Sequence, residues 1–249
     1  MTEPVRIIGS FLSPFVRKVL VCLDLKGIPY QIDPLIPFFG DDRFSQLSPL
    51  RRVPVLIDDL VTLCDSSVIC QYLEDRYPTP PLYPRHIVQR AAARWLEEFS
   101  DTRMAEVVIW RVFNQVAIGP AVWGDSTNQD VLRRALDQEF PSILDYLESQ
   151  LPSTGFACGE LSIADLSLGA MFRNVALSRV PIDDSRWPKT VAYLGRVLAL
   201  DCFTKLVPIE NRLIRTAPRQ HRAALADLKV PLTPETLATE SPRKGVMNT

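Results

Sequence analysis

Residues 10–27 read SFLSPFVRKVLVCLDLKG and decide how the N-terminal region folds. Pro14 suits the first position of a helix, because its φ is already near the helical value and it lacks an N–H that would be unpaired there. Ser13 is then the predicted N-cap, with its hydroxyl accepting from a backbone N–H one turn into the helix. Gly27 is the predicted stop. The predicted buried face has apolar residues at helical spacing: Val16, Val19, Leu20 and Leu23.

Ser13 has two interpretations at this point. A helix cap requires nothing more than its hydroxyl. The positive end of a helix is also a favourable place to bind or stabilise an anion, and a hydroxyl held there can take part. The stretch alone favours the cap over a catalytic role.

The segments on either side of this helix predict a compact βαβ unit. Residues 5–8 and 30–35 are short and rich in β-branched or aromatic side chains, and they flank the helix at 14–26. Two strands joined through a helix are expected to run parallel with a right-handed crossover. An irregular region follows from Pro37 to Arg52.

The next segment predicts a β-hairpin and a helix. The apolar runs 53–57 and 60–63 are separated by two aspartates. Pro54 opens the first run, where a sheet tolerates proline, and its bond to Val53 is a candidate for the cis form. Ser66 or Ser67 is expected to cap the helix that follows, which extends to about residue 77.

Beyond a proline-dense connector at 77–84, the β signal nearly disappears and the pattern becomes helical. Ser162 and Asp165 form a predicted capping box at the start of an apolar and therefore central helix. After Thr216 the apolar period fades into a tail that is either a surface wrap or a disordered end. The predicted helices span 87–114, 129–150, 163–177, 188–199 and 201–214, the last one kinked or broken at Pro208.

These segments predict an α/β domain followed by an all-α domain. The first, residues 1–80, has the order βαβ-ββα. The second, residues 87–215, is all-helical, and residues 216–249 form a C-terminal tail.

Composition excludes several classes of partner. Of 249 residues, 47% are hydrophobic and 23% are charged, as in soluble globular proteins. The net charge of −1 offers no bulk attraction to nucleic acid or an anionic membrane. No apolar run approaches the roughly 18 residues that span a bilayer. The first residues lack the basic and apolar regions of a signal peptide, so we expect a cytoplasmic protein.

The cysteines and histidines predict no metal site. The five cysteines contain no C-x-x-C and no metal-like spacing, and most are expected to be small buried residues. Cys64 borders the hairpin, where a buried spacer is favoured over a redox-sensitive thiol. His86 and His221 lie apart, in the connector and the tail, and both are expected to face solvent.

Four motifs together resemble the cytosolic glutathione transferase family over about residues 4–215. They are SPFVRKV at 13–19, RVPVL at 52–56, DSSVI at 65–69 and SIAD at 162–165. The resemblance implies a thioredoxin-like N-terminal domain and a helical C-terminal domain. It is closest to serine-type members, with local similarity to tau-like, omega-like and bacterial sequences. Omega-like members carry cysteine where this chain has Ser13.

The resemblance also implies a role for each motif. Ser13 occupies the position of the catalytic hydroxyl, and Val53, before Pro54, that of the residue whose backbone pairs with the cysteinyl part of glutathione. Asp65 and Ser66 match the pair that receives the γ-glutamyl end. A further basic residue, Arg52, matches a position near the glycyl carboxylate.

Two positions depart from the family pattern. Many serine-type members have glutamate where this chain has Asp65, so the glutamyl ammonium would approach more closely or through a water. The loop 37–40 shows no match to the lysine that tau-like members use, and Arg43 is the candidate substitute.

The chemistry implied is activation of a thiol. A thiol is a poor nucleophile until it is deprotonated, and a hydrogen bond from Ser13 together with the helix end would favour the thiolate. The implied function is conjugation of glutathione to a small electrophile, a detoxification reaction. A glutathione-dependent peroxidase and a non-catalytic glutathione-binding protein are the alternatives. Arg17 and Lys18 are expected on an exposed face, with added positive potential near the sulfur as the alternative for Arg17.

The resemblance further implies a homodimer and an electrophile pocket between the two domains. Arg111 in this pocket would either favour an anionic co-substrate or face solvent. The predicted wall residues are Phe11, Leu12 and Phe38 from the first domain, and Met104, Val107, Val108 and Arg111 from the second.

Overall fold

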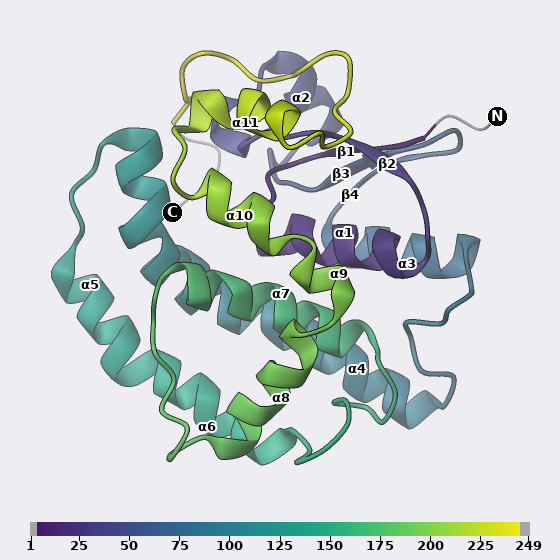
Figure 1. Cartoon of the computed structure of the whole chain (residues 1–249), viewed down its shortest axis with the longest axis vertical. Coiled ribbons are helices and arrows are strands. Elements are labelled where there is room, and N and C mark those ends of the chain that lie inside the picture. Colours follow the sequence, from purple (N-terminus) through teal and green to yellow (C-terminus); the bar gives the residue numbers. More distant parts are fainter. Residues whose placement is uncertain (1–3, 245–249) are drawn as a thin grey trace. The chain divides into compact units, whose positions relative to one another are not determined.

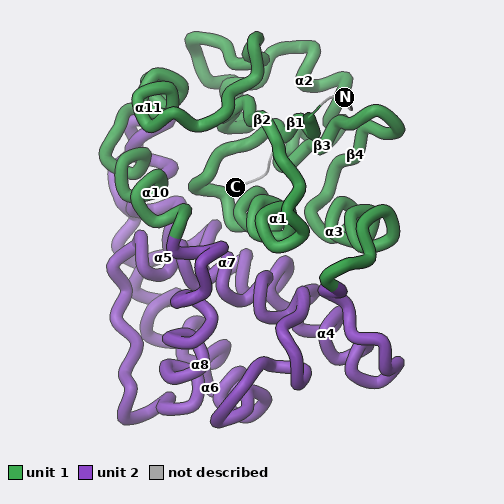
Figure 2. The backbone as a smooth tube through the Cα atoms, turned by 45° about the vertical axis from the view of Figure 1, so that its right-hand side comes forward, with its two compact units in different colours: residues 1–80, 205–249 green, residues 81–204 purple. Residues whose placement is uncertain are grey.

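The computed structural model describes residues 4–244, which divide into two compact units. One unit combines the N-terminal segment to Pro80 with the C-terminal segment from Lys205, and the other comprises Pro81–Thr204 (Figure 2). The C-terminal segment therefore returns to the N-terminal unit.

A four-stranded mixed sheet forms the centre of the first unit. The strand order is β2-β1-β3-β4, with β1 parallel to β2 and antiparallel to β3, and β3 antiparallel to β4. The strands are β1 (Val5–Ile8), β2 (Tyr30–Asp33), β3 (Val55–Ile57) and β4 (Thr62–Cys64). The parallel pair confirms the predicted βαβ unit, and β3 with β4 confirms the hairpin.

Helices cover both faces of this sheet. Figure 1 shows α1 (Pro14–Leu25) and α3 (Ser66–Arg76) side by side along one face, with α2 and α11 on the other. The predicted stripe of α1 is fully buried, and Gly27, at φ 65°, follows the end of the helix as expected. The remaining helices of this unit are α2 (Asp42–Leu47), α10 (Val207–Leu213), α11 (His221–Asp227) and two 3₁₀ turns, Pro37–Phe39 and Pro218–Gln220.

The second unit is helical, apart from two isolated β-bridges between Phe156 and Glu160. The predicted helix from 87 continues to Trp123, its second part in the wider π-helical form. The elements are α4 (Ile87–Phe99), the π-helical segment Ser100–Trp123, α5 (Gln129–Arg134), the π-helical turn Ala135–Glu139, α6 (Phe140–Gln150), α7 (Ile163–Leu177), α8 (Pro188–Leu198) and α9 (Asp201–Thr204).

The central helix of this unit is α7, as predicted. Twelve of its residues are buried. Gly169 lies so close to Phe203 that an added Cβ would be 2.7 Å from the ring, so only glycine allows this approach. Asp165 accepts from the Ser162 N–H at 2.8 Å and from the buried Tyr193 hydroxyl at 2.6 Å. The capping-box residues thus hold α7 and take no part in the site described below.

Several local expectations differ from the structure. The irregular region contains α2, a six-residue helix too short to show a period, which is capped by Asp41. The predicted 201–214 helix is broken, as expected, but just before Pro208: α9 ends at Thr204, and Pro208 lies in the first turn of α10. His221 was expected in solvent, but it is 3% exposed at the start of α11, and its burial lowers its pKa. His86 is exposed as expected.

Candidate active site

The ends of three neighbouring strands lie side by side at one end of the sheet. The predicted site residues lie in the segments directly before or after these strand ends. Ile8 pairs with Val55, and Val55 pairs with Cys64. The end of β1, which leads to Ser13, therefore lies beside Pro54 at the start of β3 and Asp65 at the end of β4. Hydrogen-bond register alone brings these three segments together.

Ser13 is the N-cap of α1, as the sequence predicts. Its backbone is extended, and its hydroxyl accepts from the Val16 N–H at 3.4 Å. Its own N–H donates to the Ser10 carbonyl at 3.0 Å, which fixes the turn before the helix. The side chain is half-buried. The long capping contact leaves a hydroxyl that both caps the helix and stands at its positive end.

The bond between Val53 and Pro54 is cis, in the form that the sequence suggested. Gly9, at φ 153°, allows β1 to approach this segment closely, since an added Cβ would lie 3.2 Å from Val53 Cβ and 2.4 Å from Val16 Cγ2. Val53 is thus packed next to the turn that carries Ser13.

Asp65, not Ser66 or Ser67, caps α3, which corrects the expectation. Its carboxylate accepts from the Ser67 N–H at 2.9 Å and the Val68 N–H at 3.2 Å. Its φ of 77° is unusual for a residue with a side chain and lets the carboxylate turn back over the helix. Ser66 is the first residue of α3 and is 3% exposed. The start of α3 thus combines a carboxylate, a serine and backbone N–H groups.

Arg52 precedes Val53 and has an exposed side chain. Its backbone is held by one hydroxyl: the Arg52 N–H donates to Ser48 Oγ at 3.0 Å, and Ser48 Oγ donates to the Arg52 carbonyl at 2.8 Å. The guanidinium therefore extends from a fixed backbone. The candidate substitute, Arg43, instead contacts Asp41 at 2.8 Å and Glu235 at 3.4 Å.

The two basic residues one turn into α1 are buried, contrary to expectation. Arg17 is fully buried and forms an ion pair with Glu210 of α10, and its Nη2 donates to the Phe11 carbonyl at 3.0 Å. Lys18 is 1% exposed and its Nζ donates to Ser67 Oγ at 3.0 Å. The sequence pattern missed both, because their partners come from α10 and α3. Arg17 thereby supports the turn before Ser13, and Lys18 ties α1 to the first turn of α3.

The residues predicted to line an electrophile pocket are mostly buried within their own units. Phe11 and Phe38 are buried in the first unit, and Met104, Val107 and Val108 in the second. Arg111 forms ion pairs with Glu106 and Glu139. Two carboxylates thus neutralise the Arg111 charge, and Arg111 gives little support for an anionic co-substrate.

Cys64 is not the buried spacer that was favoured. It is half-buried and its Sγ donates to the Leu47 carbonyl at 2.9 Å. Burial raises the pKa of this thiol, so its reactive thiolate form is disfavoured. Cys22, Cys70, Cys158 and Cys202 are buried, as predicted. Over residues 4–244 no group of three His, Cys, Asp or Glu side chains is arranged to hold a metal ion, and no helix there is long and apolar enough to cross a membrane.

Comparison with known proteins gives a consistent family. Residues 8–81 match the model of the glutathione S-transferase N-terminal domain. A glutathione S-transferase of Triticum aestivum is 25% identical over 185 residues, 72% of this chain and 82% of that protein. A maleylacetoacetate isomerase of Rattus norvegicus is 29% identical over 201 residues, 78% of this chain and 87% of that protein.

Comparison of the fold with solved structures also finds glutathione transferases. The crystal structure of a glutathione S-transferase from Methylobacterium radiotolerans JCM 2831, in complex with glutathione sulfonate, superposes with a TM-score of 0.68 at 23% identity. The match covers 82% of this chain and 94% of that one. A thioredoxin-like unit and a helical unit, together with the family model and these relatives, define the class: residues 8–81 are a glutathione S-transferase N-terminal domain, and over most of its length the chain is similar to glutathione transferases.

Proposed function

We propose that this protein binds glutathione, stabilises its thiolate through Ser13 and conjugates it to a small electrophile. The observation that carries the proposal is the meeting of the Ser13 turn, Val53–Pro54 and Asp65 at one sheet edge. The glutathione sulfonate complex of the Methylobacterium relative supports the choice of ligand.

Each end of glutathione has a suitable partner among these residues. The backbone of Val53 pairs with the cysteinyl part in the manner of an added strand. The Asp65 carboxylate attracts the γ-glutamyl ammonium, while Ser66, at the positive end of α3, receives the γ-glutamyl carboxylate. The exposed guanidinium of Arg52 is available to the glycyl carboxylate. These donors and acceptors match the charges of the tripeptide in order.

Ser13 acts as a hydrogen-bond donor and not as a covalent nucleophile. A free thiol has a pKa of about 8.5, and its thiolate is the reactive form. Donation from Ser13 to the sulfur, together with the positive end of α1, favours the charged form and lowers the thiol pKa. One unit of pKa corresponds to about 1.4 kcal/mol, and we expect a depression of roughly one to two units. The bound thiolate supplies the nucleophile.

We further propose a cytoplasmic homodimer that works without a metal ion. The cysteines of this chain are free thiols, as expected in a reducing compartment. The proposed mechanism needs only a hydroxyl, a helix end and the ligand's own sulfur. A detoxification role follows from conjugation of electrophiles.

The rat relative favours a second candidate, glutathione-dependent isomerisation. In that reaction the thiolate adds to a double bond and is later expelled, so the same Ser13 role applies. Thiol–disulfide exchange on the protein would need a cysteine in place of Ser13 and is not favoured. Reduction of peroxides by glutathione and binding of glutathione without catalysis are the third and fourth candidates.

One set of assays separates these candidates. Calorimetry measures glutathione binding, and turnover is measured with a model aryl halide, an organic hydroperoxide and maleylacetoacetate. We expect micromolar to millimolar binding and turnover of the aryl halide. Tight binding with no turnover of any substrate would identify a binding protein. Failure of the native chain to bind glutathione would overturn the proposal.

A further inference from the structure

Residues 231–243 form an extended segment, here called the C-terminal strap, along the outer edge of the sheet. The edge strand β2 pairs on one side with β1, and on its other side the Ile32 N–H donates to the Pro231 carbonyl at 2.9 Å. The Thr233 N–H returns a hydrogen bond to the Ile32 carbonyl at 3.1 Å. The strap therefore forms hydrogen bonds with backbone N–H and carbonyl groups of β2 that would otherwise be unpaired at the edge of the sheet.

The strap then crosses to the loop that follows β2. The Asp41 N–H donates to the Leu237 carbonyl at 2.8 Å, and the Thr239 N–H donates to the Phe39 carbonyl at 2.7 Å. Thr239 Oγ1 donates to the same carbonyl at 2.8 Å. These bonds fasten residues 39–41 along the strap.

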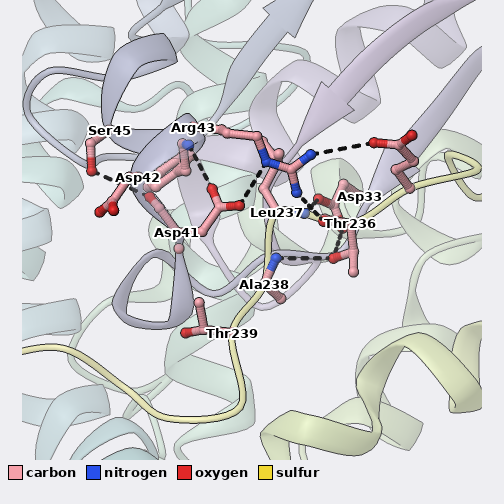
Figure 3. Close-up of polar contacts among 12 residues, drawn as sticks. Asp33, Asp41, Asp42, Arg43, Ser45, Thr236, Leu237, Ala238 and Thr239 are labelled. Atoms are coloured by element: carbon pink, nitrogen blue, oxygen red, sulfur yellow. Dashed lines mark hydrogen bonds and ion pairs between the residues drawn. The ribbon is translucent and has the colours of Figure 1, made fainter.

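Asp33, the last residue of β2, anchors the crossing point (Figure 3). It is 2% exposed, and its carboxylate accepts from the Leu237 N–H and from Thr236 Oγ1, both at 2.7 Å. Burial raises the pKa of Asp33, although these bonds and Arg222 act in the opposite direction. Asp33 pairs with Ile8, so it lies at the same end of the sheet as the candidate site.

A cluster of ion pairs around Arg43 also connects the strap to the loop. Figure 3 shows Arg43 between Asp41 and the strap. Its guanidinium contacts the Asp41 carboxylate at 2.8 Å, the Glu235 carboxylate at 3.4 Å and the Thr236 carbonyl at 3.2 Å. Arg43, the candidate substitute for the lysine of tau-like members, therefore joins the strap to the loop.

The same loop is held from inside by Arg51. Its guanidinium donates to the Gly40 carbonyl at 2.6 Å, the Asp41 carbonyl at 3.2 Å and Ser45 Oγ at 2.5 Å. Arg51 is 6% exposed and directly precedes Arg52 and Val53. Residues 40–41 thus contact the strap on one side and, on the other, the residue that leads into the proposed glutathione site.

We propose that the C-terminal strap is a positioning element of this site. It presses the 37–45 loop onto Arg51 and so fixes Arg52 and Val53, the proposed partners of the glycyl and cysteinyl parts of glutathione. The inference rests on the proposed function. The strap bonds to β2 and to this loop, whereas the Ser13 turn is held by Ser10, Val16 and Arg17, so loss of the strap changes glutathione binding and leaves the thiol pKa as it was.

Two strap variants of the full chain test this inference. The double variant Thr236→Val/Thr239→Val removes the hydroxyl bonds to Asp33 and Phe39. Leu237→Pro removes the N–H that donates to Asp33. The matched control is Thr216→Val, because the Thr216 hydroxyl donates at 2.8 Å to the Arg212 carbonyl, which lies outside the strap and the loop. For each protein we measure the KM for glutathione, kcat, the thiol pKa of bound glutathione and amide hydrogen exchange over residues 37–53.

The expected result is a split between binding and chemistry. Exchange over residues 37–53 accelerates in both variants, and the KM for glutathione rises roughly five- to tenfold, as expected for the loss of one or two hydrogen bonds. The values of kcat and thiol pKa stay at those of the native chain. The control matches the native chain throughout.

Three results would overturn the inference. Unchanged exchange over 37–53 would show that the strap does not hold the loop. Faster exchange with an unchanged KM would show that the loop does not position the site. A lower KM would show that the strap competes with glutathione. If the native chain binds no glutathione, the proposed function fails as well, and the native titration alone distinguishes that case.

Discussion

Asp65 is the residue at which structural and functional roles are hardest to separate. Its carboxylate already accepts two backbone N–H groups of α3, and in the proposed site it also attracts the glutamyl ammonium. A cap needs only an acceptor oxygen, whereas attraction of an ammonium needs the charge. Substitution by asparagine removes the negative charge and keeps an acceptor oxygen.

We therefore predict that Asp65→Asn weakens glutathione binding without unfolding the protein. The amide oxygen still caps α3, and asparagine has the same size and shape as the aspartate that already adopts this backbone conformation. The KM for glutathione should rise about 10-fold or more, since a hydrogen bond to a charged group contributes roughly 1.5–3 kcal/mol. The free energy of unfolding should change by less than about 0.5 kcal/mol.

Asp65→Ala is the matched comparison, because alanine loses both the charge and the cap. We expect the same weakening of binding and an additional loss of about 1 kcal/mol in stability. Equal glutathione affinity in the native chain and in Asp65→Asn would show that the carboxylate only caps the helix.

At the scale of elements, the ion pair between Arg17 and Glu210 joins α1 to α10. Both side chains are almost fully buried, and Arg17 also holds the Phe11 carbonyl. A buried charge that loses its partner is costly, whereas replacement of both charges by apolar groups is often tolerated. The pair therefore links the C-terminal segment to the turn before Ser13.

We predict that Glu210→Gln lowers the free energy of unfolding by about 3–5 kcal/mol, because it removes the buried negative charge that pairs with Arg17. The double variant Arg17→Met/Glu210→Leu should recover most of this loss. Denaturant unfolding of the two variants and the native chain makes the comparison. A stability of Glu210→Gln equal to that of the native chain would show that this pair does not join the two elements.

The turn between β3 and β4 predicts a pH dependence. Burial alone would raise the pKa of Asp58, but hydrogen bonds from the Tyr72 hydroxyl and the Leu60 and Val61 N–H groups, with the charge of Arg76, hold it below the usual 3.8. Since the folded-state pKa is lowered, the stabilisation is complete well above 3.8 and is lost as the pH falls through the folded-state value. The hairpin is thus joined to α3 by an ionised carboxylate.

We predict that Asp58→Asn costs about 1–2 kcal/mol at neutral pH and progressively less below pH 3.8. Unfolding measured from pH 7 to pH 2 tests this. The neighbouring Asp59 is 47% exposed and contacts Arg76 at 2.7 Å, so Asp59→Asn is the control and should cost less than about 0.5 kcal/mol at any pH. A pH-independent difference for Asp58→Asn would contradict the account.

At the scale of the whole molecule, the proposed homodimer predicts an apolar surface that needs a partner. Ile87 and Val88, at the start of α4, are 76% and 66% exposed. Contiguous exposed apolar patches mark protein interfaces, and we expect these two side chains to lie in the contact between protomers. Sedimentation should therefore give a dimer for the native chain and a monomer for Ile87→Lys/Val88→Lys. Leu228→Lys, at another exposed apolar position, is the control; a monomeric native chain would overturn the proposal of a dimer.

Local patterns were sufficient to predict most elements. The Ser13–Pro14 start and the apolar stripe of α1 depend on neighbouring residues, and so do the hairpin and the α7 cap. The short α2 was missed because six residues show no period. The C-terminal strap matches the surface wrap, one of the two alternatives for the tail, but its partners could not be predicted because Asp33 and Phe39 lie about 200 residues earlier in the chain. Long-range pairing of this kind leaves no trace in a local pattern.

The candidate site follows the same division. The motifs predict Ser13, Pro54 and Asp65 as site residues, and strand register explains why their segments meet. Arg17 and Lys18 were misplaced, because charged residues are usually exposed and only their distant partners allow burial. Arg43 was considered for the ligand, and its contacts with Asp41 and the strap give it another role.

The thiol pKa of bound glutathione reports directly on whether Ser13 stabilises the thiolate. It is followed by the ultraviolet absorbance of the thiolate during a pH titration of the complex, for the native chain, Ser13→Ala and a control, Ser149→Ala, on the exposed surface of α6. We expect a pKa about one to two units below the free value of about 8.5 in the native chain and the control. A value closer to 8.5 is expected in Ser13→Ala, with a loss of turnover of roughly 10-fold or more. The same thiol pKa in all three complexes would contradict the account.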